Sequence, residues 1–136
     1  MRIRLLFTLA VPLIALPAFA QTRSPNECGS IPVLEYHKIT GKDSRWGRSH
    51  DGFRRDLELL YSRGYRPITV SQLVDKTIDI AAGMSPVVVT FDDASPGQFR
   101  YVEKGGALEI DPKSAVGIWL AFSQAHPDWG TRATFC

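Results

Sequence analysis

The chain has 136 residues, of which 44% are hydrophobic and 22% are charged, an ordinary composition for a globular protein. Its formal net charge is only +2, and its basic residues are not gathered into a run. Both features argue against electrostatic binding of nucleic acid, so we predict no nucleic-acid partner.

The first 20 residues have the pattern of a secretory signal peptide. Arg2 and Arg4 make a basic start, an apolar run follows over residues 5–16, and Ala18 and Ala20 form a small-residue cleavage site. The run is too short for a membrane span, and no later segment has the roughly 18 apolar residues that a span needs. We therefore predict cleavage after Ala20, a secreted or periplasmic location, and a mature chain without a transmembrane segment.

Export would permit a disulfide, and the chain has two cysteines, Cys28 and Cys136. A bridge between them would stabilise the fold by roughly 4–5 kcal/mol in the loop-entropy account. The sequence does not show whether their Cβ atoms meet, so the bridge stays an open alternative. No Cys-x-x-Cys pattern is present, and a thiolate metal site is therefore not expected.

After a polar linker over residues 21–30, the chain alternates short strands and helices. Residues 31–36 form an apolar run typical of a buried strand, and the polar residues 40–52 predict a loop. The apolar side chains of residues 53–61 repeat at helical spacing, and Gly64 is placed to end that helix in a left-handed conformation.

A second strand and helix precede the strongest strand of the sequence. Residues 66–70 predict a brief strand, after which Ser71 caps a short helix over residues 72–76. Residues 86–91, Pro-Val-Val-Val-Thr-Phe, form a continuous β-branched run that predicts a strand covered on both faces. This alternation predicts an α/β fold, with a parallel sheet or barrel.

The last third of the chain predicts a hairpin, a helix and a strand. The hairpin is centred on Gly105-Gly106. Asp111 and Pro112 then predict the N-cap and first residue of a helix over about residues 113–124, which places Trp119 in its buried stripe. Residues 132–136 begin another buried strand.

Two adjacent carboxylates follow the central strand directly. Asp92 and Asp93 stand at its C-terminal end, where α/β sheets bind their ligands. Because the chain turns there, both side chains can face one site, and one can ligate a metal while the other acts as a general base. Alternatively, the pair caps the next element by accepting backbone N–H bonds.

Four stretches, in order, resemble the polysaccharide deacetylases, also called the NodB-homology or carbohydrate esterase family 4 domain. Residues 86–93 resemble the family's first motif, and residues 32–39 resemble its P-V-L-x-Y-H strand. Residues 53–69 resemble its F-x-x-x-L helix and G-Y strand, and residues 132–135 resemble its A-T-F-F strand. The resemblance covers residues 31–136.

The resemblance implies a distorted (β/α) barrel and the metal-dependent removal of N-acetyl or O-acetyl groups from a polysaccharide. It implies that Asp92 is the general base and that Asp93 is a ligand of a divalent metal, usually zinc. It does not imply a protein partner. The family's second motif, with two metal-binding histidines, would follow Cys136. We therefore expect the N-terminal part of such a barrel, truncated after its first few βα units and inactive alone.

Two other functions remain open on the residues. The first is a non-catalytic, periplasmic saccharide-binding or vestigial protein, which would need no metal. The second is a glycosidase that uses Asp92 with another acid. Adjacent carboxylates fit a glycosidase poorly, because its two carboxyl groups flank a bond from about 5 Å or more apart.

Four further side chains are candidates to line the substrate. His37 ends the first strand near the carboxylate pair, where it lines the site or bonds a neighbouring loop. Trp46 stacks on a sugar ring or anchors its loop. Arg100 and Tyr101, on the hairpin, roof a substrate groove or cover exposed core. His50 lies in the polar loop and is predicted to be solvated.

Overall fold

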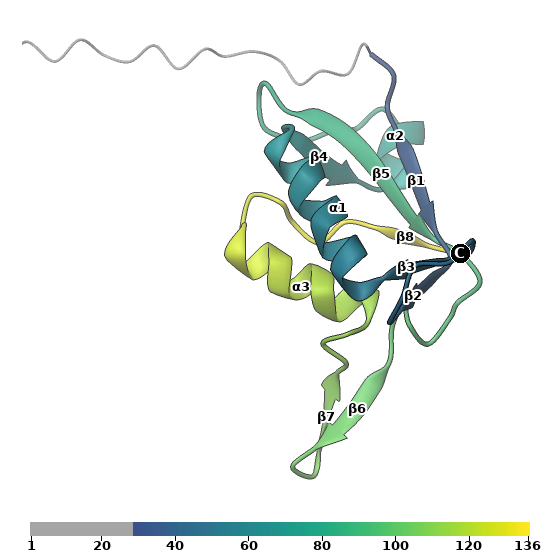
Figure 1. The fold of residues 1–136 in the computed structure, drawn as a ribbon. Coiled ribbons are helices and arrows are strands. Elements are labelled where there is room, and N and C mark those ends of the chain that lie inside the picture. Colours follow the sequence, from purple (N-terminus) through teal and green to yellow (C-terminus); the bar gives the residue numbers. More distant parts are fainter. Residues whose placement is uncertain (1–28) are drawn as a thin grey trace, which may run out of the picture.

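The computed structural model describes residues 29–136, so the predicted signal peptide, most of the linker and Cys28 lie outside the described residues. The fold is mixed α/β (Figure 1). Its elements are, in chain order, β1 (Val33–Tyr36), β2 (Lys38–Thr40), β3 (Gly47–Ser49), α1 (His50–Ser62), β4 (Tyr65–Ile68), α2 (Val70–Val74), β5 (Ser85–Phe91), β6 (Tyr101–Lys104), β7 (Ala107–Ile110), α3 (Ala115–Ala125) and β8 (Thr134–Phe135). Within this described part, none of the helices has the length and apolar character needed to cross a bilayer.

Strand β5 is the centre of a four-stranded sheet. It pairs with β1 on one side, while β4 and β8 pair with different halves of its other side. All three pairings are parallel, which confirms the predicted parallel α/β sheet. The sheet is open, and residues 29–136 do not close a barrel.

The main core lies between this sheet and the helices α1 and α3, which lie on one face of it (Figure 1). Because side chains alternate along a strand, Val87, Val89 and Phe91 of β5 share that face. They pack with Phe53 and Leu57 of α1 and with Ile118 and Trp119 of α3. Val88 points the other way and is equally buried, so the prediction that β5 is covered on both faces is confirmed.

Strand β1 differs from the prediction of a buried strand. Among the described strands of this sheet it pairs only with β5, and the side chain of Val33 is largely exposed. Leu34 and Tyr36 pack against the core, so Glu35 points to the opposite face of the sheet, where its side chain is exposed. Because β1 is an edge strand, its side chains alternate between the core and solvent instead of being buried on both faces.

Polar caps place the helix starts differently from the sequence patterns. Ser49 caps α1 by accepting a bond from the backbone N–H of Gly52, so the predicted 40–52 loop contains β3 and the first residues of α1. Thr69, not Ser71, caps α2, in a reciprocal capping box with Gln72. The left-handed Gly64 after α1 is confirmed, with a φ of +79°.

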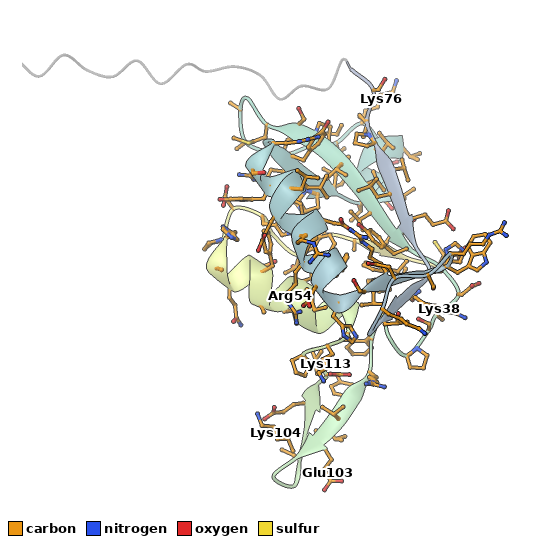
Figure 2. The ribbon with its side chains drawn as sticks, in the orientation of Figure 1. Lys38, Arg54, Lys76, Glu103, Lys104 and Lys113 are labelled. Atoms are coloured by element: carbon orange, nitrogen blue, oxygen red, sulfur yellow. The ribbon has the colours of Figure 1, made fainter. Side chains whose placement is uncertain are left out.

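The hairpin of β6 and β7 is confirmed and projects away from the sheet (Figure 1). Figure 2 shows the charged side chains of Glu103 and Lys104 on this projecting part. Helix α3 follows it, but Ser114 rather than Asp111 is its N-cap. Asp111 is instead buried and bonded to Arg100 at the base of the hairpin.

The loop that follows β5 packs directly on β2. A Cβ atom at Gly97 would lie 2.1 Å from the carbonyl oxygen of Ile39, a buried backbone atom that cannot give way cheaply. Only glycine therefore permits this approach. The contact fixes the loop that carries Asp92 and Asp93 against the connection from β1.

Replacing this glycine tests the contact. We expect Gly97→Ala to lower the free energy of unfolding by about 1–3 kcal/mol or more, because the added methyl group overpacks a backbone contact. Gly41→Ala is the matched control: nothing lies within 4 Å of its Cβ position, so stability should stay unchanged or rise slightly. Urea denaturation followed by circular dichroism measures both. Equal stabilities of the two variants would contradict the packing argument.

Candidate functional site

The carboxyl ends of β1 and β5 bring His37 and Asp92 together at one edge of the sheet. Tyr36 of β1 is the register partner of Phe91 of β5, so the next residues along the two strands are neighbours. The backbone N–H of Asp92 donates to the carbonyl of Tyr36 at 3.0 Å, which extends the ladder by one bond. The end of the chain lies at the same edge (Figure 1), because β8 also pairs with the end of β5.

Glu35, which no sequence pattern singles out, joins these two residues. Glu35 lies in β1, and His37 directly follows the end of that strand. The Nε2 atom of His37 lies 3.4 Å from Oε1 of Glu35. Ligand atoms of Glu35, His37 and Asp92 all lie within 4.8 Å of one another. We call these three residues the carboxylate–histidine group. Their donors are of the types that bind zinc and similar divalent metals.

Asp93 lies outside the carboxylate–histidine group, because the backbone turns sharply after Asp92. The φ angles of Asp93 and Ala94 are +70° and +42°, in the left-handed region that residues with a Cβ seldom adopt. Oδ1 of Asp92 accepts a bond from the backbone N–H of Asp93 at 3.1 Å. The side chain of Asp93 is exposed, whereas that of Asp92 is half-buried.

A buried glutamine holds the two strand ends together. The Nε2 atom of Gln98 donates to the carbonyl of His37 at 2.6 Å and also to the carbonyl of Asp92. The Ser95 hydroxyl donates to the same His37 carbonyl at 3.2 Å. The Gln98 side chain is 2% exposed, so it exchanges these bonds little with water. Nothing in the local sequence pattern distinguishes Gln98 from an ordinary loop residue.

Trp46 lies beside the carboxylate–histidine group and remains 57% exposed. Its ring centroid is 5.2 Å from that of His37, and the Arg45 guanidinium lies 5.0 Å above it. A cleft of about 350 Å³ is lined by Glu35, Tyr36, His37, Ser44, Arg45, Trp46, Gly47 and Arg48. An exposed aromatic ring therefore stands at a cleft that contains two members of the carboxylate–histidine group.

An ion-pair network holds this side of the cleft to α1. Arg48 binds both carboxylate oxygens of Asp56, at 2.8 and 2.6 Å, and the Tyr36 hydroxyl donates to the same carboxylate at 3.0 Å. Burial and the negative charge of Asp56 raise the pKa of Tyr36 above its usual value. Tyr36 therefore stays protonated, and its hydroxyl donates to Asp56. This bond holds the end of β1 against α1.

The structure gives Arg100 and Tyr101 other partners. Arg100 donates to Asp111 at 2.6 Å, and the Tyr101 ring lies edge-on to Phe99 with centroids 5.2 Å apart. Both stand at the start of the projecting hairpin and are not part of the carboxylate–histidine group. Their predicted role in lining the substrate stays a prediction.

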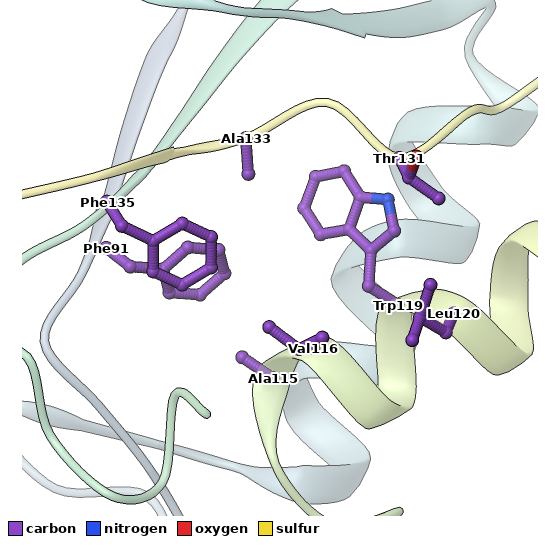
Figure 3. A pocket seen from close by; sticks show the side chains of 8 residues that line it. All are labelled: Phe91, Ala115, Val116, Trp119, Leu120, Thr131, Ala133 and Phe135. Atoms are coloured by element: carbon purple, nitrogen blue, oxygen red, sulfur yellow. The ribbon is translucent and has the colours of Figure 1, made fainter. Parts of the chain in front are cut away.

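A separate apolar pocket lies between α3 and β8 (Figure 3). Its volume is about 230 Å³, and its lining is Phe91, Ala115, Val116, Trp119, Leu120, Thr131, Ala133 and Phe135. The Phe91 and Phe135 rings stack there, with centroids 4.8 Å apart. The lining has no titratable side chain, so this pocket does not supply acid, base or metal chemistry. Trp119 is 4% exposed and belongs to the core, as predicted.

Comparisons with protein-family models, with curated proteins and with solved structures find no match to this chain.

We expect the ion pair between Arg100 and Asp111 to make a pH-dependent contribution to the stability of the fold. The backbone N–H of Lys113 and the guanidinium of Arg100 hold the pKa of Asp111 below its usual value. A lowered folded-state pKa stabilises the fold above the unfolded pKa of about 4, and this contribution is lost as the pH falls through the folded value. We expect Asp111→Asn to cost about 1–3 kcal/mol at pH 7 and clearly less at pH 2.5.

Glu103→Gln is the control for this measurement, since Glu103 is exposed on the same hairpin. It should change the free energy of unfolding by less than about 0.5 kcal/mol at either pH. Urea titrations of both variants at the two pH values give the comparison. A cost of Asp111→Asn that does not vary with pH would mean that packing, not charge, is lost.

Proposed function

We propose that this chain forms part of a metal-dependent hydrolase that removes acetyl groups from a polysaccharide. The observation that carries the proposal is the convergence of His37 and Asp92, with Asp93 next in sequence, at the carboxyl end of a parallel sheet. This is the edge at which α/β proteins bind ligands. The four sequence stretches that resemble polysaccharide deacetylases support the same function, and the donor types of the carboxylate–histidine group fit the metal that such a function needs.

The reaction is the addition of water to an acetyl carbonyl. A bound divalent metal supplies Lewis-acid polarisation of that carbonyl and a water of lowered pKa. A carboxylate of the Asp92–Asp93 pair takes the proton of the attacking water. The bond from the acetyl carbon to the sugar nitrogen or oxygen then breaks, and the leaving atom gains the proton that the carboxylate took from the water. The products are acetate and a free amine or hydroxyl group.

Trp46 is proposed as the platform for the sugar ring next to the reacting one. Its exposed face can pack against the C–H groups of a pyranose, and the adjoining cleft has room for polar substituents. The pairing of Lys38 with Gly47 and the bond from the Lys38 N–H to the Trp46 carbonyl hold the backbone of Trp46 in place. A fixed aromatic ring loses little conformational entropy on binding.

A non-catalytic saccharide-binding protein is the second candidate. The cleft and Trp46 favour it, because an aromatic platform binds sugars without a metal. The family's second motif is not among the residues of this chain, so we expect slow or no turnover by the 136-residue chain itself. The two candidates therefore differ in whether sugar binding depends on a divalent metal.

Binding of a short acetylated saccharide separates them. The 136-residue chain is titrated with diacetylchitobiose and with fully deacetylated chitobiose, with zinc and with chelator, while amide signals are followed by NMR. We expect the acetylated ligand to shift signals of Trp46, His37 and Asp92 in the presence of zinc, and the chelator to weaken binding. Trp46→Ala should weaken it about tenfold through loss of the aromatic contact. Phe99→Ala, an exposed aromatic on the hairpin, should not.

Other outcomes have distinct meanings. Binding that is equally tight with chelator would favour the saccharide-binding candidate. Rapid zinc-dependent release of acetate would contradict the expected inactivity of the chain alone. Release of reducing sugar without acetate would indicate a glycosidase and overturn the proposed function.

A further inference from the structure

We infer that Glu35, His37 and Asp92 bind a divalent metal ion, and that Asp92 rather than Asp93 is the ligand from the carboxylate pair. This inference deepens the proposed function by naming the metal ligands. Metal binding is measurable without any turnover, so the two can fail separately. The family resemblance gives the opposite assignment, with Asp93 as the ligand.

The first observation is the spacing of two donor atoms. His37 Nε2 and Glu35 Oε1 are 3.4 Å apart. Two ligands with bonds of about 2.0–2.2 Å to one tetrahedral zinc ion are separated by roughly 3.3–3.6 Å. The pair therefore already has the separation of two ligands on one ion. A carboxylate oxygen of Asp92 also lies within 4.8 Å of a ligand atom of each of these two residues.

The second observation concerns charge. Among the described residues, seven other acidic side chains form ion pairs with arginine or lysine, namely Asp43, Asp51, Asp56, Asp79, Asp111, Asp128 and Glu109. Within residues 29–136, neither Glu35 nor Asp92 pairs with arginine or lysine, and the partner of Glu35 is His37. In the same range, Glu58, Asp75, Asp93 and Glu103 also lack an arginine or lysine partner, but only Glu35 and Asp92 lie close together in the carboxylate–histidine group. Two neighbouring carboxylates repel each other unless a positive charge lies between them. A divalent cation supplies that charge.

The third observation is that the backbone beneath these ligands is fixed. The parallel register of β1 and β5 sets the distance between His37 and Asp92. Gln98 then bonds both of their carbonyl groups from a buried position. Ligands carried by backbone that is already held in place lose little entropy when a metal binds. Asp93 has no comparable support, since it lies beyond the turn and is exposed.

Three protein ligands leave one position of a tetrahedral ion for water or substrate, which is the arrangement of catalytic rather than structural zinc. Glu35 and His37 also line the cleft beside Trp46. The inferred ion would therefore be reached from the same cleft as the proposed sugar platform. With Asp92 on the metal, the exposed Asp93 is the carboxylate left to act as the base.

The test uses Trp46 as a built-in probe. Paramagnetic Co²⁺ bound at His37 should quench Trp46, because the two rings are 5.2 Å apart, whereas Trp119 and Trp129 are buried in the core. The untagged 136-residue chain is titrated with Co²⁺ by fluorescence and with Zn²⁺ by calorimetry. We expect saturable binding of one ion per chain. Trp46→Phe should lose the quenching and keep the calorimetric Zn²⁺ signal.

Shape-conserving variants identify the ligands. His37→Gln, Glu35→Gln and Asp92→Asn should each weaken Zn²⁺ binding at least as much as loss of a supporting partner does, about 10–100-fold. Asp93→Asn and His50→Gln are the matched controls and should change the affinity less than about threefold. The Asp92→Asn change keeps a side-chain oxygen that can accept the Asp93 N–H, and urea denaturation checks that every variant is folded.

Three results would overturn the inference: no saturable binding of either ion, unchanged affinity in Asp92→Asn, or loss of binding in Asp93→Asn with Asp92→Asn unaffected. The last result would support the assignment that the family resemblance implies. Zinc binding as expected, without metal-dependent binding of acetylated saccharide, would leave the metal site in place and refute the proposed function.

Discussion

The site depends on one strand that is hydrogen-bonded on both sides and buried on both faces. β5 pairs with β1, β4 and β8, and Val87, Val88 and Val89 are fully buried. A strand so constrained cannot shift its register without moving its apolar side chains out of the core. Its end therefore delivers Asp92 to a defined place, next to the residue that ends β1. The polar residues of the site lie directly beyond the end of this constrained strand.

Two residues outside the carboxylate–histidine group hold the loop after β5 in place. Gly97 allows the loop after β5 to approach the Ile39 carbonyl closely, and Gln98 bonds the carbonyls at the ends of β1 and β5. Buried polar groups stabilise a structure only when they are satisfied, and Gln98 uses its amide hydrogens on two strand ends at once. The loop is thus an extension of the sheet rather than a free connection.

The apolar runs and turn residues of the sequence predicted much of the fold. The partners of its polar side chains could not be predicted in the same way. The β-branched run of β5, the parallel α/β alternation and the Gly105-Gly106 hairpin follow from local propensity and are confirmed. The predicted start of α3 was wrong because the carboxylate of Asp111 can either cap a helix or form an ion pair. In the structure it pairs with Arg100 in a buried position. Glu35 was missed because its significance needs the neighbouring strand. Glu35 and His37 are close in sequence, but only the β1–β5 register brings Asp92 to them.

Asp92 and Asp93 are equivalent in sequence, and the backbone makes them different. The left-handed turn at Asp93 sends the two carboxylates into unlike surroundings, one half-buried against β1 and one exposed. A metal ligand benefits from fixed position and from neighbouring donors, both of which Asp92 has. A general base needs access to water and a carboxylate free of the metal, and Asp93 has that access. In the site that we infer, the roles of ligand and base therefore follow the surroundings of each side chain and not its order along the chain.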